Sequence, residues 1–195
     1  MKTFYFLRHG QTDYNARDLF QGRVDQPLNP KGIKEAEYTA SLVKDMNLHF
    51  DYVISSPSLR AQQTCRIVSG CTDIRRDERL YEIAYGSYEG TPVFHTDEVM
   101  QVFLRDPWNQ DPPDGVESLY AIKERTLSFF DDMLNEINEG ETVLVSSHGI
   151  ALYCLFRGIG ERTGKTIDLF PDHGCLYCLS VNEGQYDEPY LCIHA

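Results

Sequence analysis

The stretch FYFLRHG, residues 4–10, is a short run of apolar and aromatic residues that ends in an arginine, a histidine and a glycine. A second stretch, TVLVSSHG at residues 142–149, follows the same plan and also ends in a histidine and a glycine. Short apolar runs of this kind are typical of strands buried in a parallel sheet. Since parallel strands have their carboxyl ends on one side of a sheet, neighbouring strands would bring His9 and His148 to face each other across one crevice.

The rest of the chain alternates further strand patterns with helix patterns. Residues 176–181, like the two stretches above and residues 52–55, have the composition of a buried parallel strand. Apolar residues at three- and four-residue spacing predict helices over about 30–46, 57–70 and 117–139. This alternation predicts an α/β fold, a three-layer sandwich with a mostly parallel central sheet and helices on both faces.

Residues 83–116 interrupt the alternation with glycines, prolines, aromatic residues and acids. This segment holds too few apolar residues to form a core of its own. We therefore expect a single domain over residues 1–195, in which 83–116 is an insertion that covers the carboxyl edge of the sheet, where open α/β folds bind ligands.

The composition excludes several classes of partner. The chain has 195 residues, with 18 Lys plus Arg against 30 Asp plus Glu, so its net charge of −12 disfavours nucleic acid and anionic membranes. No apolar run approaches the roughly 20 residues needed to span a bilayer, and no cleavable leader is visible, so we expect a cytoplasmic protein. Six cysteines are too sparse for a disulfide scaffold, and Cys175 and Cys178 fit core positions.

Cationic and neutral donors accompany the two histidines. Arg8 precedes the first histidine, and Arg60 opens the helix after a predicted strand end, so both guanidinium groups can reach the crevice. A guanidinium fork binds two phosphate oxygens at once. Asn15 adds a neutral donor, and Gly149 permits close backbone approach at a helix start that favours anions. Together these residues predict a phosphoryl-binding site.

Five ordered blocks across residues 7–150 resemble the histidine phosphatase superfamily, also called the phosphoglycerate-mutase-like family. The family's opening signature resembles Leu7-Arg8-His9-Gly10-Gln11-Thr12 with Asn15, Gln21-Gly22, Asp25, Pro27-Leu28 and Gly32. The later motifs resemble Ser55-Ser56-Pro57 with Arg60-Ala61, Gln63 and Thr64, then Leu80, Glu82, Tyr85-Gly86 and Glu89-Gly90, then Gly115 and Glu117-Ser118, then Ser147-His148-Gly149.

The resemblance implies a phosphohistidine mechanism that needs no metal and no cofactor, acting on a small phosphorylated substrate. It implies that His9 is the nucleophile and Glu82 the general acid, with an imidazolium at His148. It assigns the phosphate pocket to Arg8, Asn15, Arg60, His148 and Gly149, and we expect the loop with Gln21 and Gly22 to contribute to substrate binding. The attacking nitrogen of His9 must be neutral, so its other nitrogen needs a hydrogen-bond acceptor that fixes the tautomer.

A phosphomonoesterase is the main interpretation within this family, and a cofactor-dependent phosphoglycerate mutase is the alternative. The mutases typically read Glu-Arg-His/Arg-Tyr-Gly where this chain has EIAYG at residues 82–86. A substrate carboxylate needs a cationic partner, and Ile83 and Ala84 offer none. The sequence therefore favours hydrolysis.

Two hypotheses lie outside phosphohistidine chemistry. A metallohydrolase would use His9, His148 and Glu82 as ligands, but Arg8 and Arg60 in the same crevice would repel a metal cation. The other hypothesis is a non-catalytic phosphate-binding module, because a fold can be retained after its catalytic activity is lost.

The sequence leaves other features open. The histidines His95 and His173 match no motif and are interpreted as structural or surface residues. The oligomeric state stays open between a monomer and a homo-oligomer.

Overall fold

The computed structural model describes all 195 residues and has a seven-stranded central sheet with helices on both faces, which confirms the expected α/β class. The strands are β1 (Lys2–Arg8), β2 (Tyr52–Ser55), β3 (Arg75–Arg76), β4 (Thr142–Ser147), β5 (Leu176–Asn182), β6 (Gln185–Tyr186) and β7 (Tyr190–Ile193). The helices are α1 (Asp13–Ala16), α2 (Pro30–Asp45), α3 (Leu59–Ser69), α4 (Glu98–Arg105), α5 (Leu119–Glu136) and α6 (Gly149–Arg162), with three 3-10 helices at Glu78–Leu80, Gly86–Tyr88 and Val93–His95.

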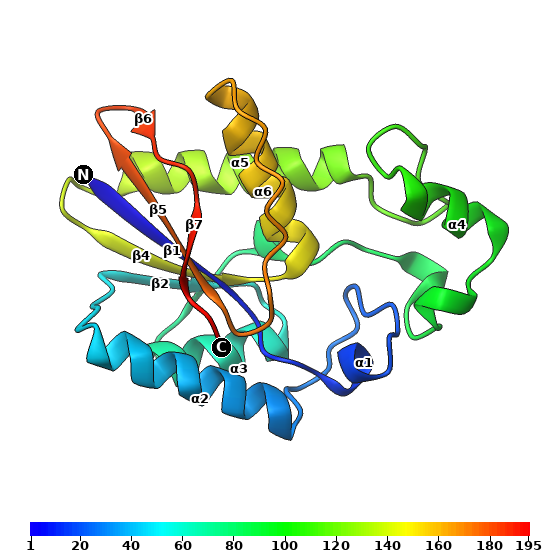
Figure 1. Cartoon of the computed structure of the whole chain (residues 1–195), viewed down its shortest axis with the longest axis horizontal. Helices are drawn as coiled ribbons and strands as arrows, with labels where there is room; N and C mark the ends of the chain where they lie inside the picture. The colour runs from blue at the N-terminus through cyan, green and yellow to red at the C-terminus, as the bar shows by residue number, and fades with distance from the viewer.

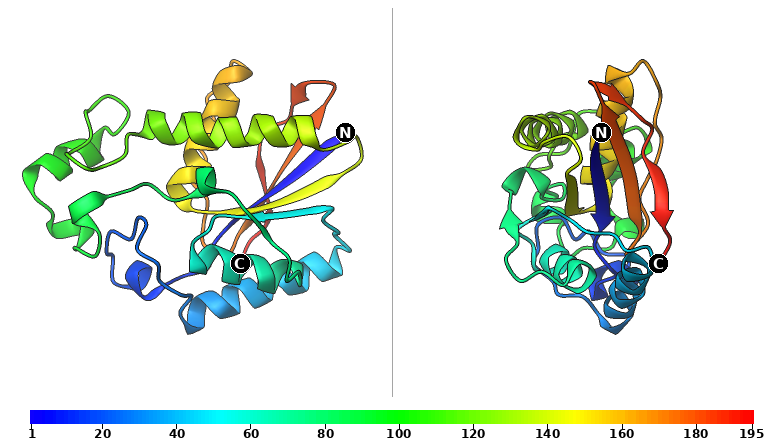
Figure 2. Two further views of the ribbon diagram at one scale, coloured as in Figure 1. Left: turned by 180° about the vertical axis from the view of Figure 1, so that it is seen from behind. Right: turned by 90° about the vertical axis from the view of Figure 1, so that its left-hand side faces the viewer.

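Alternate side chains of β1 pack against different helix layers. Phe4 and Phe6 face α5 and α6, where their rings lie 4.8 Å from Phe130 and 5.4 Å from Phe156, measured between centroids. Leu7 belongs to the cluster on the other face, which α2 and α3 cover. Figures 1 and 2 show these two helix pairs on opposite sides of the strands. The alternation buries β1 on both faces, as its apolar sequence predicts.

The sheet is less parallel than expected. Strands β3, β2, β4 and β1 form a parallel set, but β5 pairs antiparallel with β1, β6 and β7. After α6, residues 163–175 run back to the carboxyl edge of the sheet before β5 begins (Figure 1). Leu176 therefore pairs with Leu7 at the end of β1. The expectation of a parallel strand at 176–181 is wrong because this return segment reverses the strand direction.

The insertion at residues 83–116 carries α4 and lies beyond the carboxyl ends of the parallel strands (Figure 1). Its apolar residues share a second hydrophobic cluster with the beginning of α5 and with α6. The buried members of this cluster are Phe20, Ile83, Tyr85, Met100, Phe103, Val116, Leu119, Ile122, Ala151 and Cys154. Of the insertion's aromatic residues, Phe103 is buried in this cluster, Trp108 packs against it and Phe94 is exposed.

The six cysteines are all free thiols, and both Cys175 and Cys178 are buried, as their sequence context predicts. None of the helices combines the length and the hydropathy that a membrane span requires.

Candidate active site

The ends of β1 and β4 place the two histidines side by side. The strands are paired in parallel, the His9 backbone N–H donates to Ser147 O at 3.1 Å, and the rings of His9 and His148 have centroids 5.1 Å apart. This confirms that the two strand ends bring the imidazoles together, although the rings are direct neighbours and only His9 lines a cavity.

A cavity of about 200 Å³ opens at this edge of the sheet. Its walls include seven of the residues that the sequence singled out, namely Arg8, His9, Asn15, Gln21, Gly22, Arg60 and Glu82. Of the other two, His148 is fully buried against His9 and Gly149 is the first residue of α6, so neither lines the cavity. The remaining walls are mostly apolar: Leu19, Phe20, Tyr85, Val93, Leu104, Ile150 and Phe170.

His9 is 97 % shielded from solvent, and its two ring nitrogens have different partners. Nδ1 lies 2.7 Å from Gly10 O, which can only accept, so Nδ1 carries the proton and Nε2 keeps its lone pair. Burial and the positive charge of Arg60 hold the pKa of His9 well below its ordinary value. His9 is thus a neutral imidazole with the tautomer that attack through Nε2 requires.

The loop after β1 is held by close backbone contact. A Cβ added to Gly10 would lie 2.4 Å from Gly32 O, so only glycine allows the start of α2 to pack directly on this loop. The Gly10 backbone N–H donates to Thr64 Oγ1 of α3 at 3.1 Å. Two helices therefore hold the backbone whose carbonyl sets the tautomer of His9.

Arg60 reaches the nucleophile from α3. Its Nε donates to His9 Nε2 at 3.3 Å, while Nη1 and Nη2 donate to Val24 O at 3.0 Å and Gly22 O at 2.7 Å. Gly22 has a φ of +48° and leaves no room for a Cβ against Glu89, so the turn that offers its carbonyl requires glycine. Burial lowers the pKa of Arg60 to about 10. Even so, the guanidinium stays charged at neutral pH, directly beside His9.

Arg8 is held from the segment that precedes β5. Its Nη1 donates to Pro171 O at 2.6 Å, and its Nη2 lies 2.9 Å from His173 Nε2. Its guanidinium also lies 5.3 Å from the centre of the Phe170 ring. Burial and the charge of Arg8 lower the pKa of His173 to about 3, so His173 is neutral and its Nε2 accepts from Arg8.

The interpretation of His173 as a structural or surface residue is therefore incomplete, because its ring also lies 5.6 Å from the ring of His9. No sequence pattern indicates this contact, since residues 163–175 have no periodic pattern and return to the site only because β5 runs antiparallel.

Without a bound phosphoryl group, the surroundings of His148 disfavour the imidazolium that we expected there. Complete burial and the charge of Arg60 hold its pKa well below the ordinary value. Its Nε2 lies 2.8 Å from Ser56 Oγ and 3.3 Å from Ser58 Oγ, and hydroxyl donation to Nε2 leaves the proton on Nδ1. His148 is thus a neutral donor, because a second buried cation beside the arginines would be costly.

Asn15 and Gln21 are oriented by one threonine. In the capping box of α1, Asn15 Oδ1 accepts from the Thr12 backbone N–H at 3.1 Å, and the Thr12 hydroxyl lies 2.8 Å from Gln21 Oε1. Both carbonyl oxygens are therefore engaged, and each side chain keeps its NH₂ group as a donor.

The carboxyl group of Glu82 lies against the first turn of α6. Its Oε1 accepts from the backbone N–H of Ile83 and of Ala151, both at 3.1 Å, and its Oε2 accepts from Ile150 at 3.3 Å. We expected this helix start, at Gly149, to meet a bound anion directly. Instead the carboxylate of Glu82 occupies the backbone donors of Ile150 and Ala151.

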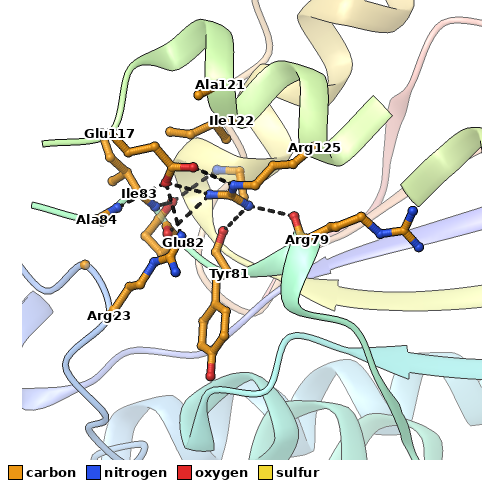
Figure 3. A network of polar contacts seen from close by, with 12 residues as sticks. Arg23, Arg79, Tyr81, Glu82, Ile83, Ala84, Glu117, Ala121, Ile122 and Arg125 are labelled. Carbon is orange, nitrogen blue, oxygen red and sulfur yellow. Dashed lines mark hydrogen bonds and ion pairs between the residues drawn. The ribbon is translucent and has the colours of Figure 1, made fainter. Parts of the chain in front are cut away.

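Behind Glu82, an arginine on α5 fixes the backbone that carries it (Figure 3). Arg125 donates to the carbonyls of Arg79 at 2.6 Å, Tyr81 at 2.7 Å and Glu82 at 3.3 Å. Its Nε and Nη2 also donate to the two carboxylate oxygens of Glu117, at 2.8 Å and 3.0 Å. Arg125 was not predicted from the sequence, because one arginine on an amphipathic helix has no signature that separates it from a surface charge.

Four buried side-chain nitrogen or oxygen atoms in the molecule have no hydrogen-bond partner. Three of them, Arg8 Nε, Gln21 Nε2 and His148 Nδ1, are donors on residues of this site, and the fourth is Thr96 Oγ1. Leaving a buried donor unpaired costs roughly 1–3 kcal/mol. The arrangement therefore suits a ligand that brings several acceptor oxygens.

Three neutral buried histidines make the stability of the protein depend on pH. The pKa values of His9, His148 and His173 lie below those of the unfolded chain. The unfolded chain therefore binds more protons below about pH 6.5. The three neutral histidines contribute fully to stability above that pH. Their contribution is lost on acidification, and for His173 the loss continues down to about pH 3. Urea unfolding should show a free energy that falls by up to about 4 kcal/mol per pH unit for the three groups together.

Substituting His173→Gln should reduce that slope by roughly one third, since one of three such groups is removed. The same substitution at the exposed His95 controls for the change of side chain. Equal slopes in the His173→Gln variant and the wild type would contradict the assignment of a neutral His173.

Comparison with known proteins places this site in a family. Residues 4–190 match the family model described as the histidine phosphatase superfamily, branch 1. A candidate phosphoserine phosphatase of Hydrogenobacter thermophilus is 34% identical over 168 residues, which cover 82% of this chain and 81% of that protein. A 2,3-bisphosphoglycerate-dependent phosphoglycerate mutase of Rhizobium etli is 33% identical over 181 residues, covering 84% and 82%.

Among solved structures, YhfR of Bacillus stearothermophilus superimposes with a TM-score of 0.81 at 28% identity, over 96% of this chain and 95% of that one. The match to the family model spans the sheet, both helix layers and the insertion. The names of the two sequence relatives point to different reactions, so similarity alone does not separate hydrolysis from mutase activity.

Proposed function

Since the chain belongs to the histidine phosphatase superfamily, we propose that it is a metal-independent phosphomonoesterase that hydrolyses a small phosphorylated metabolite through a phosphohistidine intermediate. One observation carries the proposal: the Nε2 lone pair of the neutral His9 faces the Arg60 guanidinium, and Arg8, Gln21 and His148 of the same site each have a donor without a partner. Such a site combines a nucleophile with groups that bind phosphoryl oxygens.

In the first half-reaction, His9 Nε2 attacks phosphorus. The N–P bond forms as the bond from phosphorus to the ester oxygen breaks, and the leaving oxygen takes the bonding electron pair. A protonated Glu82 gives its proton to that oxygen, which departs as a neutral alcohol. The Nδ1–H bond to Gly10 O stabilises the positive charge that develops on the ring.

The second half-reaction reverses these roles. The Glu82 carboxylate takes a proton from water, and the resulting hydroxide attacks the phosphohistidine. The N–P bond breaks, its electron pair returns to His9 Nε2, and inorganic phosphate is released. Glu82 is again protonated and His9 again neutral, so the cycle balances without a metal or a redox partner.

The charge on the phosphoryl oxygens is met by protein donors. Arg8 and Arg60 supply two positive charges, and Asn15 and Gln21 on the cavity wall add neutral donors. In the proposed mechanism the unpartnered Nδ1 of the buried His148, next to His9, is a further donor. Phosphoryl transfer passes through a loose transition state in which positioning and electrostatic stabilisation do most of the catalysis. A metal ion bound to His9 would meet both guanidinium groups, which argues against the metallohydrolase hypothesis.

The phosphoglycerate mutase remains the second candidate because relatives such as the Rhizobium etli protein bear that name. A mutase must hold the carboxylate of its substrate with a cation. Ile83 is 1 % exposed in the second hydrophobic cluster, and the two arginines of the cavity are both adjacent to the expected phosphoryl position. These contacts support hydrolysis over phosphoryl transfer between phosphoglycerates.

A panel of phosphorylated metabolites tests the proposal. We expect phosphate release that exhaustive chelation does not diminish, at rates above the mutase turnover with 3-phosphoglycerate primed by 2,3-bisphosphoglycerate. A mutase rate above hydrolysis would favour the second candidate. Phosphate binding without turnover of any ester would instead indicate a non-catalytic binding module.

A further inference from the structure

A second cavity, of about 120 Å³, opens beside the first and shares Tyr85, Leu104, Ile150 and Phe170 with it. Its other walls are Ile83, Phe103, Pro107, Leu119 and Tyr153. The insertion, the start of α5, the first turns of α6 and the return segment before β5 thus enclose it together. A substrate whose phosphoryl group lies at His9 would extend into this space or past its mouth.

The second cavity has no charged wall. Its nine lining residues are apolar apart from the hydroxyl groups of its two tyrosines. Arg8 lies 5.3 Å from the Phe170 ring on the wall shared with the first cavity, but in the proposed function its charge serves the phosphoryl group. Arg157 stacks on Trp108 at 4.3 Å, and Lys123 pairs with Glu161 at 2.7 Å. A carboxylate or an ammonium group placed there would lose its water without gaining a partner.

The volume of the second cavity and the exposed residues at its mouth limit which ligand groups it can bind. An apolar cavity of about 150 Å³ holds one benzene molecule, so a single ring or a short branched alkyl group is near the capacity of this one. Phe170 and Leu104, on the wall common to both cavities, are 51 % and 37 % exposed. An apolar ligand would cover these exposed faces, whereas a polar one would leave them in water.

We propose that the second cavity binds the leaving group, and that this enzyme prefers monoesters of apolar, ring-sized alcohols that carry no charge besides the phosphate. The inference rests on the proposed function, because it assumes that the phosphoryl group lies at His9. Selectivity arises from apolar contact with Leu104, Ile150 and Phe170 and from the missing partner for a second charge.

Benzyl phosphate, ethyl phosphate and O-phosphoserine provide the test, since all three are primary alkyl monoesters and differ mainly in what the cavity must hold. We expect kcat/KM for benzyl phosphate to exceed the values for ethyl phosphate and O-phosphoserine by roughly tenfold to a hundredfold. A preference for O-phosphoserine, or equal values for all three esters, would overturn the inference while leaving the proposed function intact. The absence of hydrolysis with any ester would instead refute the proposed function.

A substitution on α4 provides a second test of the inference. Leu104→Arg places a cation on the wall shared by both cavities, and should lower kcat/KM for benzyl phosphate at least tenfold while raising it for O-phosphoserine. Val102→Arg is the matched control, because this exposed residue of the same helix lines neither cavity, and both values should stay within twofold. An unchanged ratio of the two substrates in Leu104→Arg would show that the leaving group binds elsewhere.

Discussion

Replacing His9 with alanine is expected to lower kcat by about 10⁴-fold or more with every phosphomonoester, because the side chain that attacks the ester phosphorus is removed. Rapid quenching with a ³²P-labelled substrate should trap protein-bound phosphate on the wild type, labile in acid and stable in base as expected for a phosphoramidate. The His9→Ala variant should trap none.

The controls for this experiment separate chemistry from folding. His95→Ala changes an exposed histidine outside the cavity and should retain both turnover and the trapped adduct. Urea unfolding of His9→Ala checks that the variant is folded. Turnover by a folded His9→Ala variant at more than a few per cent of the wild-type rate would eliminate phosphohistidine as the intermediate.

The convergence of His9 and His148 was predictable from sequence because it follows from strand geometry alone. Both histidines end apolar runs, and two parallel neighbours must bring their carboxyl ends together, as β1 and β4 do. The position of Arg60 in the site was predictable for the same reason, because α3 begins shortly after the end of β2. Local patterns therefore sufficed where a residue lies within a few positions of the end of a parallel strand.

Other residues of the site depend on longer-range events that no local pattern reveals. Phe170 and His173 reach Arg8 only because the chain after α6 returns to the carboxyl edge and β5 then runs antiparallel. Arg125 acts through backbone carbonyls of a segment some 40 residues earlier, a contact that depends on tertiary packing. The neutral state of His148 likewise follows from complete burial, which sequence spacing does not specify.

The Glu82→Gln variant should lose about 10²- to 10⁴-fold in kcat/KM for esters of poor leaving groups. A glutamine oxygen in the place of Oε1 can still accept from the backbone N–H of Ala151, whereas an NH₂ group replaces Oε2, which accepts from Ile150. The first turn of α6 therefore keeps one of its two bonds to this side chain. What the amide lacks is a proton to give to the departing oxygen. The deficit should therefore shrink as the leaving group becomes more acidic, and be smallest for p-nitrophenyl phosphate.

A series of para-substituted phenyl phosphates measures this dependence, because the ring stays constant while the leaving-group pKa changes. The plot of log kcat/KM against that pKa should be steeper for Glu82→Gln than for the wild type. Glu117→Gln is the matched control, since its carboxylate pairs with Arg125 behind the site and a loss there should be uniform across the series. Parallel plots for Glu82→Gln and the wild type would assign Glu82 a role in holding α6, and some other group would have to supply the proton.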